Sequence, residues 1–399
     1  MPTPKHVDAL KREVCASVDA MANQLVAVSR EIHAHPELAF EEHRASALLV
    51  DTLRKGGLAV EPGAYGLETA FEAEFGPDGR PCVALLAEYD ALPEIGHACG
   101  HNLIATAAVG AGLALTRLAA QLPGRVRVLG TPAEERGGGK ELMARNGALE
   151  GVGAALMIHP AGINLVGMPS IAIGEVEAVY RGNAAHASAM PEHGINALDA
   201  LVCAYQSISA LRQHIRESER IHGIITDGGQ APNIVPERAA GHFYVRAAGP
   251  APLEELKRRV EGCFRAGANA TGASLELAWG DVDYLPLRFN AALASCFQHN
   301  AERLGRSFVP MELIPPRVAG STDMGNVSHR VPAIHPMLAA APPHCTIHHP
   351  EFTKWAGSEL GDAAALDGAK SLAMTALDFL CDEDLQRRAR LDFEQHTDS

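Results

Sequence analysis

The 399-residue sequence predicts an α/β protein in which a small βαββαβ domain is inserted into a larger domain. Three observations predict this class. Short apolar runs alternate with helical periodicity up to about residue 170, which is typical of a sheet covered by helices. Acidic and histidine residues directly follow several of these runs, as expected where ligands gather at the carboxyl ends of strands. The order then changes to strand, helix, strand, strand, helix, strand, the ferredoxin-like plan.

The first part of the chain begins with helical patterns. Apolar residues at three- and four-residue steps predict a helix over 7–34, and an amphipathic stretch at 41–57 ends on glycine. A nearly continuous apolar run at 82–90 predicts a strand buried on both faces. A buried helix and two further strands are expected at 102–122, 125–135 and 153–162.

The inserted domain is predicted from six consecutive segments. Its strands are expected at 174–182, 221–229, 238–248 and 274–282, and its helices at 194–218 and 252–272. Helical and short strand patterns then resume and end in a long helix at 358–382. We therefore expect one discontinuous domain, 1–173 and 287–399, and an inserted domain, 174–286.

Composition excludes several classes of protein. The net charge is −14 with no basic tract, which argues against nucleic acid and anionic membranes as partners. No apolar run reaches the roughly 18 residues needed to span a bilayer. Charges occupy the amino-terminal segment where a signal peptide requires an apolar core, so a cytoplasmic location is expected. The eight scattered cysteines are expected to be reduced thiols.

Two short motifs contain residues that suit metal chemistry. Cys99 and His101 flank a glycine, and thiolate with imidazole suits zinc. Taken alone, this motif also fits a helix start with a buried cysteine. Glu134 and Glu135 are adjacent after an apolar strand, so one could bind a metal while the other acts as a general base. Solvated glutamates in a surface loop are the alternative.

Three further residues complete the pattern. His159 ends an apolar strand and His348 lies in a late loop, although each alone is also typical of a histidine without a ligand role. Asp90 follows the strand before Cys99 and could orient a ligand imidazole. Since these placements recur at strand ends and loops spread over 250 residues, their coincidence favours a metal centre.

The whole chain resembles metallopeptidase-type amidohydrolases of the M20 family. Within it, the resemblance is to the branch of aminoacylases, auxin-conjugate hydrolases, p-aminobenzoyl-glutamate hydrolases and M20-domain-containing protein 2 dipeptidases. The motifs that carry it appear in the family's order: REIHAHPELAFEE (30–42), LLAEYDALPEIGHACGHN (85–102), GTPAEERGGGK (130–140), LMIHPA (156–161), GNAAHASAMPEHGINALDAL (182–201), APNIVPERA (231–239), GSTDMGNVSHRVPAIHP (320–336) and IHHPEF (347–352).

The resemblance implies a role for each matching position. It implies one or two divalent metals per subunit, zinc first and manganese or cobalt as alternatives. It places Cys99 as a bridging ligand, makes Glu134 the general base and proton shuttle, and makes Asp90 a support for the site. The remaining implied ligands are His101, Glu135, His159 and His348. The implied fold is a zinc-peptidase-like catalytic domain with a ferredoxin-like lid that also forms a homodimer.

Three positions in the inserted domain take implied roles towards the substrate. His186 matches a histidine that reaches a neighbouring subunit's site, where it stabilises the oxyanion. Asn233 and Arg246 match residues that hold the substrate's carbonyl and carboxylate, and arginine suits a carboxylate because its fork binds two oxygens. From the residues alone, a surface histidine and an outward strand arginine remain alternatives.

We therefore expect hydrolysis of the amide bond of small N-acyl or aminoacyl amino acids, including dipeptides. Glu88 and Asn102 depart from the acylase pattern and favour the dipeptidase and aminobenzoyl-glutamate subgroups. Hydrolysis of aromatic conjugates such as p-aminobenzoyl-glutamate, or aromatic deamination, is the enzymatic alternative. A non-catalytic metal-binding scaffold and a redox role for Cys99 are the alternatives from other classes.

Overall fold

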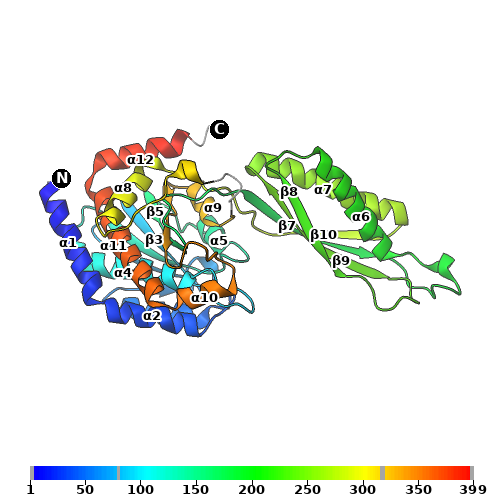
Figure 1. Ribbon diagram of the computed structural model, residues 1–399, viewed down its shortest axis with the longest axis horizontal. Helices are drawn as coiled ribbons and strands as arrows, with labels where there is room; N and C mark the ends of the chain where they lie inside the picture. Colours follow the sequence, from blue (N-terminus) through cyan, green and yellow to red (C-terminus); the bar gives the residue numbers. More distant parts are fainter. Residues whose placement is uncertain (1–3, 79–80, 315–319, 396–399) are drawn as a thin grey trace. The chain divides into compact units, whose positions relative to one another are not determined.

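The computed structural model describes residues 4–78, 81–314 and 320–395 and confirms the α/β class. The chain divides into two compact units (Figure 1). Unit 1 comprises Met1–Pro169 and Leu287–Ser399, and unit 2 comprises Ser170–Pro286. Unit 1 contains the predicted metal ligands, and each unit has its own apolar core.

Unit 1 is built on a six-stranded sheet of order β1-β2-β4-β3-β5-β11. Strands β4, β3, β5 and β11 run parallel, whereas β1 and β2 add an antiparallel edge. A separate parallel pair joins β6 to β12. The strands are β1 (Glu61–Pro62), β2 (Phe71–Phe75), β3 (Cys82–Glu88), β4 (Arg125–Thr131), β5 (Ala154–Leu156), β6 (His159–Ala161), β11 (Ala333–Ile334) and β12 (Met337–Ala339).

Helices surround this sheet in unit 1 (Figure 1). They are α1 (Pro4–Ala20), α2 (Ala22–Ala34), α3 (His43–Lys55), α4 (His101–Thr116), α5 (Gly139–Arg145), α8 (Ala291–Glu302), α9 (Met324–Ser328), α10 (Pro350–Ala356), α11 (Glu359–Cys381) and α12 (Glu383–Gln395). Helix α4 contacts both β3 and α11, and its residues from His101 to Leu115 are all buried. This packing explains why α4 is apolar on every face.

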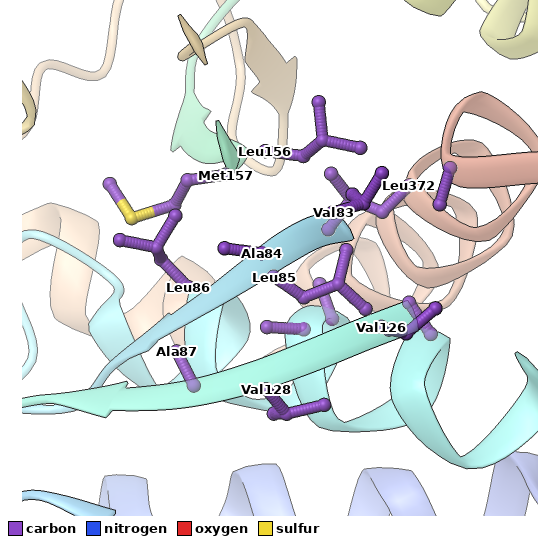
Figure 2. Packing of buried hydrophobic residues seen from close by; sticks show 14 of the residues in the cluster. Val83, Ala84, Leu85, Leu86, Ala87, Val126, Val128, Leu156, Met157 and Leu372 are labelled. Atoms are coloured by element: carbon purple, nitrogen blue, oxygen red, sulfur yellow. The ribbon is translucent and has the colours of Figure 1, made fainter. Parts of the chain in front are cut away.

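The central strand β3 determines where the site forms. All seven of its residues are buried, as expected for a parallel strand covered on both faces. In Figure 2, Val83 lies towards Leu372 of α11, whereas Leu86 lies on the other side towards Met157. Burial on both faces leaves the strand's carboxyl end as the place where polar side chains emerge.

Several predicted boundaries were wrong. The helix predicted over 7–34 is divided at Met21, which lets α1 contact α11 while α2 contacts α4. The strand predicted over 153–162 is also divided, because β5 pairs with β11 and β6 pairs with β12. The chain bends between them and thereby carries His159 out of the six-stranded sheet.

Unit 2 has the predicted βαββαβ order. Its strands β7 (Ala172–Arg181), β8 (Arg220–Asp227), β9 (Arg238–Ala247) and β10 (Ser274–Trp279) form an antiparallel sheet of order β10-β7-β9-β8. Helices α6 (Ala197–Leu211) and α7 (Pro250–Thr271) pack against each other and on β7 and β9. Among the described residues, no helix is long and apolar enough to cross a membrane.

Candidate metal centre

Cys99 and His101 lie at the start of α4, on either side of Gly100. Gly100 has a φ of 79°, and a Cβ at this position would lie 2.6 Å from Cγ of Pro160. Only glycine fits this turn, because it combines left-handed backbone with a close neighbour. The turn places the Cys99 thiol and the His101 ring on buried, adjacent positions.

Asp90 holds two parts of the site in place. Its Oδ1 lies 3.0 Å from Nδ1 of His101, and its Oδ2 accepts a hydrogen bond of 2.8 Å from the backbone N–H of Glu135. The contact with an acceptor means that Nδ1 of His101 carries a proton, and Nε2 faces the interior of the site. The Asp90 carboxylate, which was predicted to support the site, therefore contacts two predicted ligands: the side chain of His101 and the backbone of Glu135.

His159 and His348 approach the same place from different segments. Nδ1 of His159 lies 2.8 Å from the carbonyl oxygen of Pro160 and therefore carries the ring proton. Nε2 then has the lone pair, and it lies 3.3 Å from Sγ of Cys99. The backbone N–H of His348 donates to the carbonyl of Ala98 at 2.9 Å, and its Nε2 lies 3.4 Å from Oε1 of Glu135. The His348 side chain is about half exposed, at 52%.

The five predicted ligands form two groups that share Cys99. Cys99, His101 and His159 form one group, and Cys99, Glu135 and His348 form the other. Within each group the ligand atoms lie within 4.8 Å of one another. The first group offers two imidazoles and a thiolate, and the second offers a carboxylate, an imidazole and the same thiolate. Both ligand sets suit zinc and related divalent ions.

The surroundings of His101 require a cation. Its Nε2 lies 3.0 Å from Oε1 of Glu88, 3.6 Å from Oε1 of Glu135 and 3.9 Å from Oε2 of Glu134. A lone pair on Nε2 would face three carboxylates in a buried site, which is unfavourable unless a proton or metal ion lies between them. Although burial opposes the charged ring, Glu88 and Asp90 raise the pKa of His101 well above its ordinary value. The residues therefore fit a divalent metal.

Glu134 lies outside both groups that share Cys99, and it forms a third group of possible metal ligands with Glu88 and His101. Burial, followed by the charges of Glu88 and Glu135, raises its pKa well above the ordinary value of a glutamate. Burial also raises the pKa of the Cys99 thiol, so metal coordination is what would keep the thiolate. A buried carboxyl that binds a proton readily is suited to general base and acid chemistry.

A buried lysine that was given no role in the sequence prediction joins the site. The ammonium of Lys140 forms ion pairs with Glu88 and, at 2.8 Å, with Oδ1 of Asp323. All three side chains are fully buried. The two carboxylates compensate for the burial of the ammonium, and Lys140 holds Glu88 beside His101. In the sequence, the one sign of this charged cluster was Glu88, which departs from the acylase pattern. Lys140 itself gave no sign, because it follows glycines in a segment typical of a loop.

The three remaining candidates lie in unit 2. His186 and Asn233 are exposed and belong to loops joined by a hydrogen bond of 3.0 Å between Ala187 N–H and the Asn233 carbonyl. Arg246 is on β9, where its Nε donates to Nε2 of His222 at 3.2 Å and its guanidinium lies over the Tyr244 ring. None of the three belongs to the ligand groups of unit 1.

Comparisons with known proteins identify the family of this chain. Residues 84–374 match the family described as peptidase family M20/M25/M40. The chain is 41% identical to the mouse Xaa-Arg dipeptidase, covering 97% of this chain and 93% of that protein. It is 28% identical to a p-aminobenzoyl-glutamate hydrolase chain from Escherichia coli, covering 96% and 94%. A dinuclear metal-binding M20 peptidase from Bacillus subtilis shares the fold, with a TM-score of 0.67, 22% identity and coverage of 91% and 99%.

Proposed function

Because the chain belongs to peptidase family M20/M25/M40 and is a metal-dependent amidohydrolase, we propose that it is a dipeptidase that uses Glu134 as general base. The observation that carries this proposal is the pair of ligand groups sharing Cys99, with Glu134 beside them and outside both. Zinc is the proposed metal because a thiolate and two imidazoles are softer ligands than magnesium or calcium accepts. Manganese and cobalt are the alternatives.

The proposed substrate is a dipeptide with a free carboxyl-terminal carboxylate and a cationic carboxyl-terminal residue. The high identity to a mouse protein named Xaa-Arg dipeptidase over nearly the whole chain supports this choice. The net charge of −14 favours the approach of a cationic substrate through long-range attraction. The similarity to a p-aminobenzoyl-glutamate hydrolase makes aryl-glutamate conjugates the alternative substrate class.

A bound divalent cation supplies Lewis acidity, which lowers the pKa of water and polarises an amide carbonyl. Glu134 takes the proton from the attacking water as the oxygen bonds to the amide carbon. The same carboxyl then delivers this proton to the leaving nitrogen as the C–N bond breaks. The burial of Glu134 supports both steps, because a carboxyl shielded from bulk water passes its proton to the leaving nitrogen rather than to solvent.

Unit 2 is proposed to act as a lid and dimerisation domain. Asn233 and His186 lie in loops next to Arg238 at the start of β9, whereas Arg246 lies near its end. The eight residue steps from Arg238 to Arg246 span roughly 26 Å, whereas a dipeptide spans only about 7 Å. One small substrate therefore cannot contact both ends of the same sheet. This supports a homodimer in which the end that carries His186 and Asn233 and the end that carries Arg246 serve different active sites.

A matched pair of variants tests the role of Glu134. Glu134→Gln should lower kcat by about 10²–10⁴-fold and leave the metal content unchanged, because it removes only the base. Glu135→Gln is the control, and it should lose metal because Glu135 belongs to a ligand group. Activity should be assayed on zinc-, manganese- and cobalt-loaded enzyme with Xaa-Arg dipeptides, N-acyl amino acids and aryl-glutamates. Normal turnover by the Glu134 variant would refute the proposal.

Mixing inactive variants tests the shared site. His186→Ala and Glu134→Gln homodimers should each be nearly inactive. After subunit exchange, the heterodimer has one site with both an intact Glu134 and an intact His186, so activity should return to roughly a quarter of the wild-type value in an equal mixture. A mixture that stays inactive although mass spectrometry detects the heterodimer contradicts sharing between subunits.

A further inference from the structure

The segment that starts at His35 and ends at Glu42 lies against the loop that carries Glu134. Glu42 is the residue before α3 and is fully buried, but its side chain does not cap its own helix. Glu37 accepts the free N–H groups of that helix instead, from Arg44 at 2.9 Å and Ala45 at 2.8 Å. The Glu42 carboxylate is therefore available for a longer-range contact.

The Glu42 carboxylate makes that contact next to the proposed general base. Its Oε1 accepts a hydrogen bond of 2.8 Å from the backbone N–H of Ala133, the residue before Glu134. Its Oε2 accepts a hydrogen bond of 2.8 Å from the hydroxyl of Thr69. Both carboxylate oxygens of Glu42 therefore accept hydrogen bonds, and Oε1 binds a backbone N–H next to Glu134 rather than a side chain.

Ala133 needs this support because its backbone is in an unusual conformation. It is buried and has a φ of 60°, in the left-handed region that residues other than glycine seldom adopt. Its carbonyl accepts hydrogen bonds from Gly138 N–H at 3.0 Å and Gly139 N–H at 3.3 Å, which closes the loop. Glu42 satisfies the N–H group that would otherwise be buried without a partner. A strained residue of this kind persists only where its surroundings hold it.

A second contact joins the same two segments. Phe40 lies against Gly137, where an added Cβ would come within 2.4 Å of the phenyl ring. The backbone of the 35–42 segment also reaches the other side of the site, since the Glu37 carbonyl accepts a hydrogen bond of 2.8 Å from the N–H of Ala91, next to Asp90. The segment therefore touches the chain immediately before Glu134 and immediately after Asp90.

We propose that Glu42 is a positioning residue for the reaction, holding Ala133 in its left-handed conformation so that Glu134 points at the attacking water. The inference rests on the proposed role of Glu134 as base. Glu42 belongs to none of the ligand groups, so its loss should misplace the base and leave the metal in position. A displacement of about 1 Å at a reacting group can cost on the order of 100-fold in rate.

The test compares Glu42→Ala with Glu42→Gln and with Glu37→Ala as the matched control. Glu42→Ala should lower kcat by about 10- to 100-fold, while KM stays within about threefold and the metal content is unchanged. Glu42→Gln keeps an oxygen for Ala133 N–H, so its kcat should stay within about threefold of wild type. Glu37→Ala removes a comparable carboxylate whose hydrogen bonds go to the first N–H groups of α3, and its kcat should be unchanged.

Hydrogen exchange of the 131–140 peptide provides a measurement that does not depend on activity. Exchange should be faster in Glu42→Ala than in wild type and in Glu42→Gln, because the Ala133 N–H loses its acceptor. If Glu42→Ala does not fold, Thr69→Val replaces it; this variant removes only the hydroxyl that holds Oε2 and should give a smaller loss of kcat with partial loss of protection.

Three results would overturn the inference: an unchanged kcat in folded Glu42→Ala, an equal loss in Glu42→Gln, or unchanged protection of the peptide. Turnover by Glu134→Gln is measured in the same assay. If that variant is fully active, the proposed function is wrong, and the exchange data still report whether Glu42 holds Ala133.

Discussion

Replacing Lys140 with methionine should destabilise unit 1 severely. The ammonium pairs with Glu88 and Asp323, and all three side chains are fully buried. Methionine has a similar length, so little volume is lost and the effect is electrostatic. Removing one partner of a buried ion pair typically costs 3–5 kcal/mol, because the other charge stays buried without compensation. Since two carboxylates lose their partner here, we expect about 4 kcal/mol and a fall in Tm of roughly 10 °C.

The penalty should depend on pH in a defined direction. Burial raises the pKa of Asp323 to about 6 even though Lys140 lowers it. Without the ammonium this pKa rises further, so the folded variant can relieve its buried charge by binding a proton at low pH. A folded carboxyl with a raised pKa is penalised above that pKa and relieved below it. The difference in stability between wild type and Lys140→Met should therefore be larger at pH 8 than at pH 5.5.

Urea unfolding at both pH values, with equal metal loading, measures this difference. Lys11→Met is a useful control, because Lys11 pairs with Asp378 at 2.6 Å and that carboxylate is 20% exposed and keeps a donor from Asn300 at 2.9 Å. Its cost should be smaller, because the Asp378 carboxylate is partly exposed and keeps another donor. The double variant Lys140→Met with Asp323→Asn should recover part of the loss. A cost below about 1 kcal/mol for Lys140→Met, or one that shrinks as pH rises, refutes the electrostatic explanation.

Two further substitutions probe other parts of the site. Asn102→Asp should lower the free energy of unfolding in urea by about 2 kcal/mol. The Asn102 amide donates to Ser29 Oγ at 2.9 Å and to the Ala356 carbonyl at 3.0 Å, and a carboxylate cannot donate. An unchanged free energy of unfolding would contradict this explanation. Cys99→Ser should lower the metal content measured by elemental analysis, since Cys99 belongs to two of the candidate ligand groups, and an unchanged metal content would contradict its role as a ligand.

The fold was largely predictable because apolar periodicity reports burial directly. The run at 82–90 identified the central strand, and the strand and helix order of unit 2 followed from local patterns alone. The division of 153–162 into β5 and β6 was not predictable, because it depends on pairing with β11 and β12, which lie about 180 residues later. A local pattern shows that a segment is a strand, but it does not show at which residue the segment stops pairing with one strand and begins to pair with another.

The candidate ligands were recognisable by residue type and by resemblance, but Lys140 was not. Lysine is almost never fully buried unless it is paired, so a lysine after three glycines is expected at the surface. Its burial depends on Glu88 and Asp323, which are 52 and 183 residues away. Only the folded structure shows that the three charges meet.

The loop after β4 explains why adjacent glutamates were ambiguous in the sequence. Three buried carboxylates each accept one backbone N–H along this loop: Glu42 from Ala133, Asp90 from Glu135 and Asp323 from Lys140. They come from three distant segments, so nothing within residues 133–140 distinguishes this loop from a solvated one. Part of the chain's excess of acidic residues therefore acts inside the protein, where it fixes the backbone that presents Glu134. A loop held in this way depends on long-range acceptors, so the chemistry proposed for Glu134 can be lost by substitutions far from any predicted metal ligand.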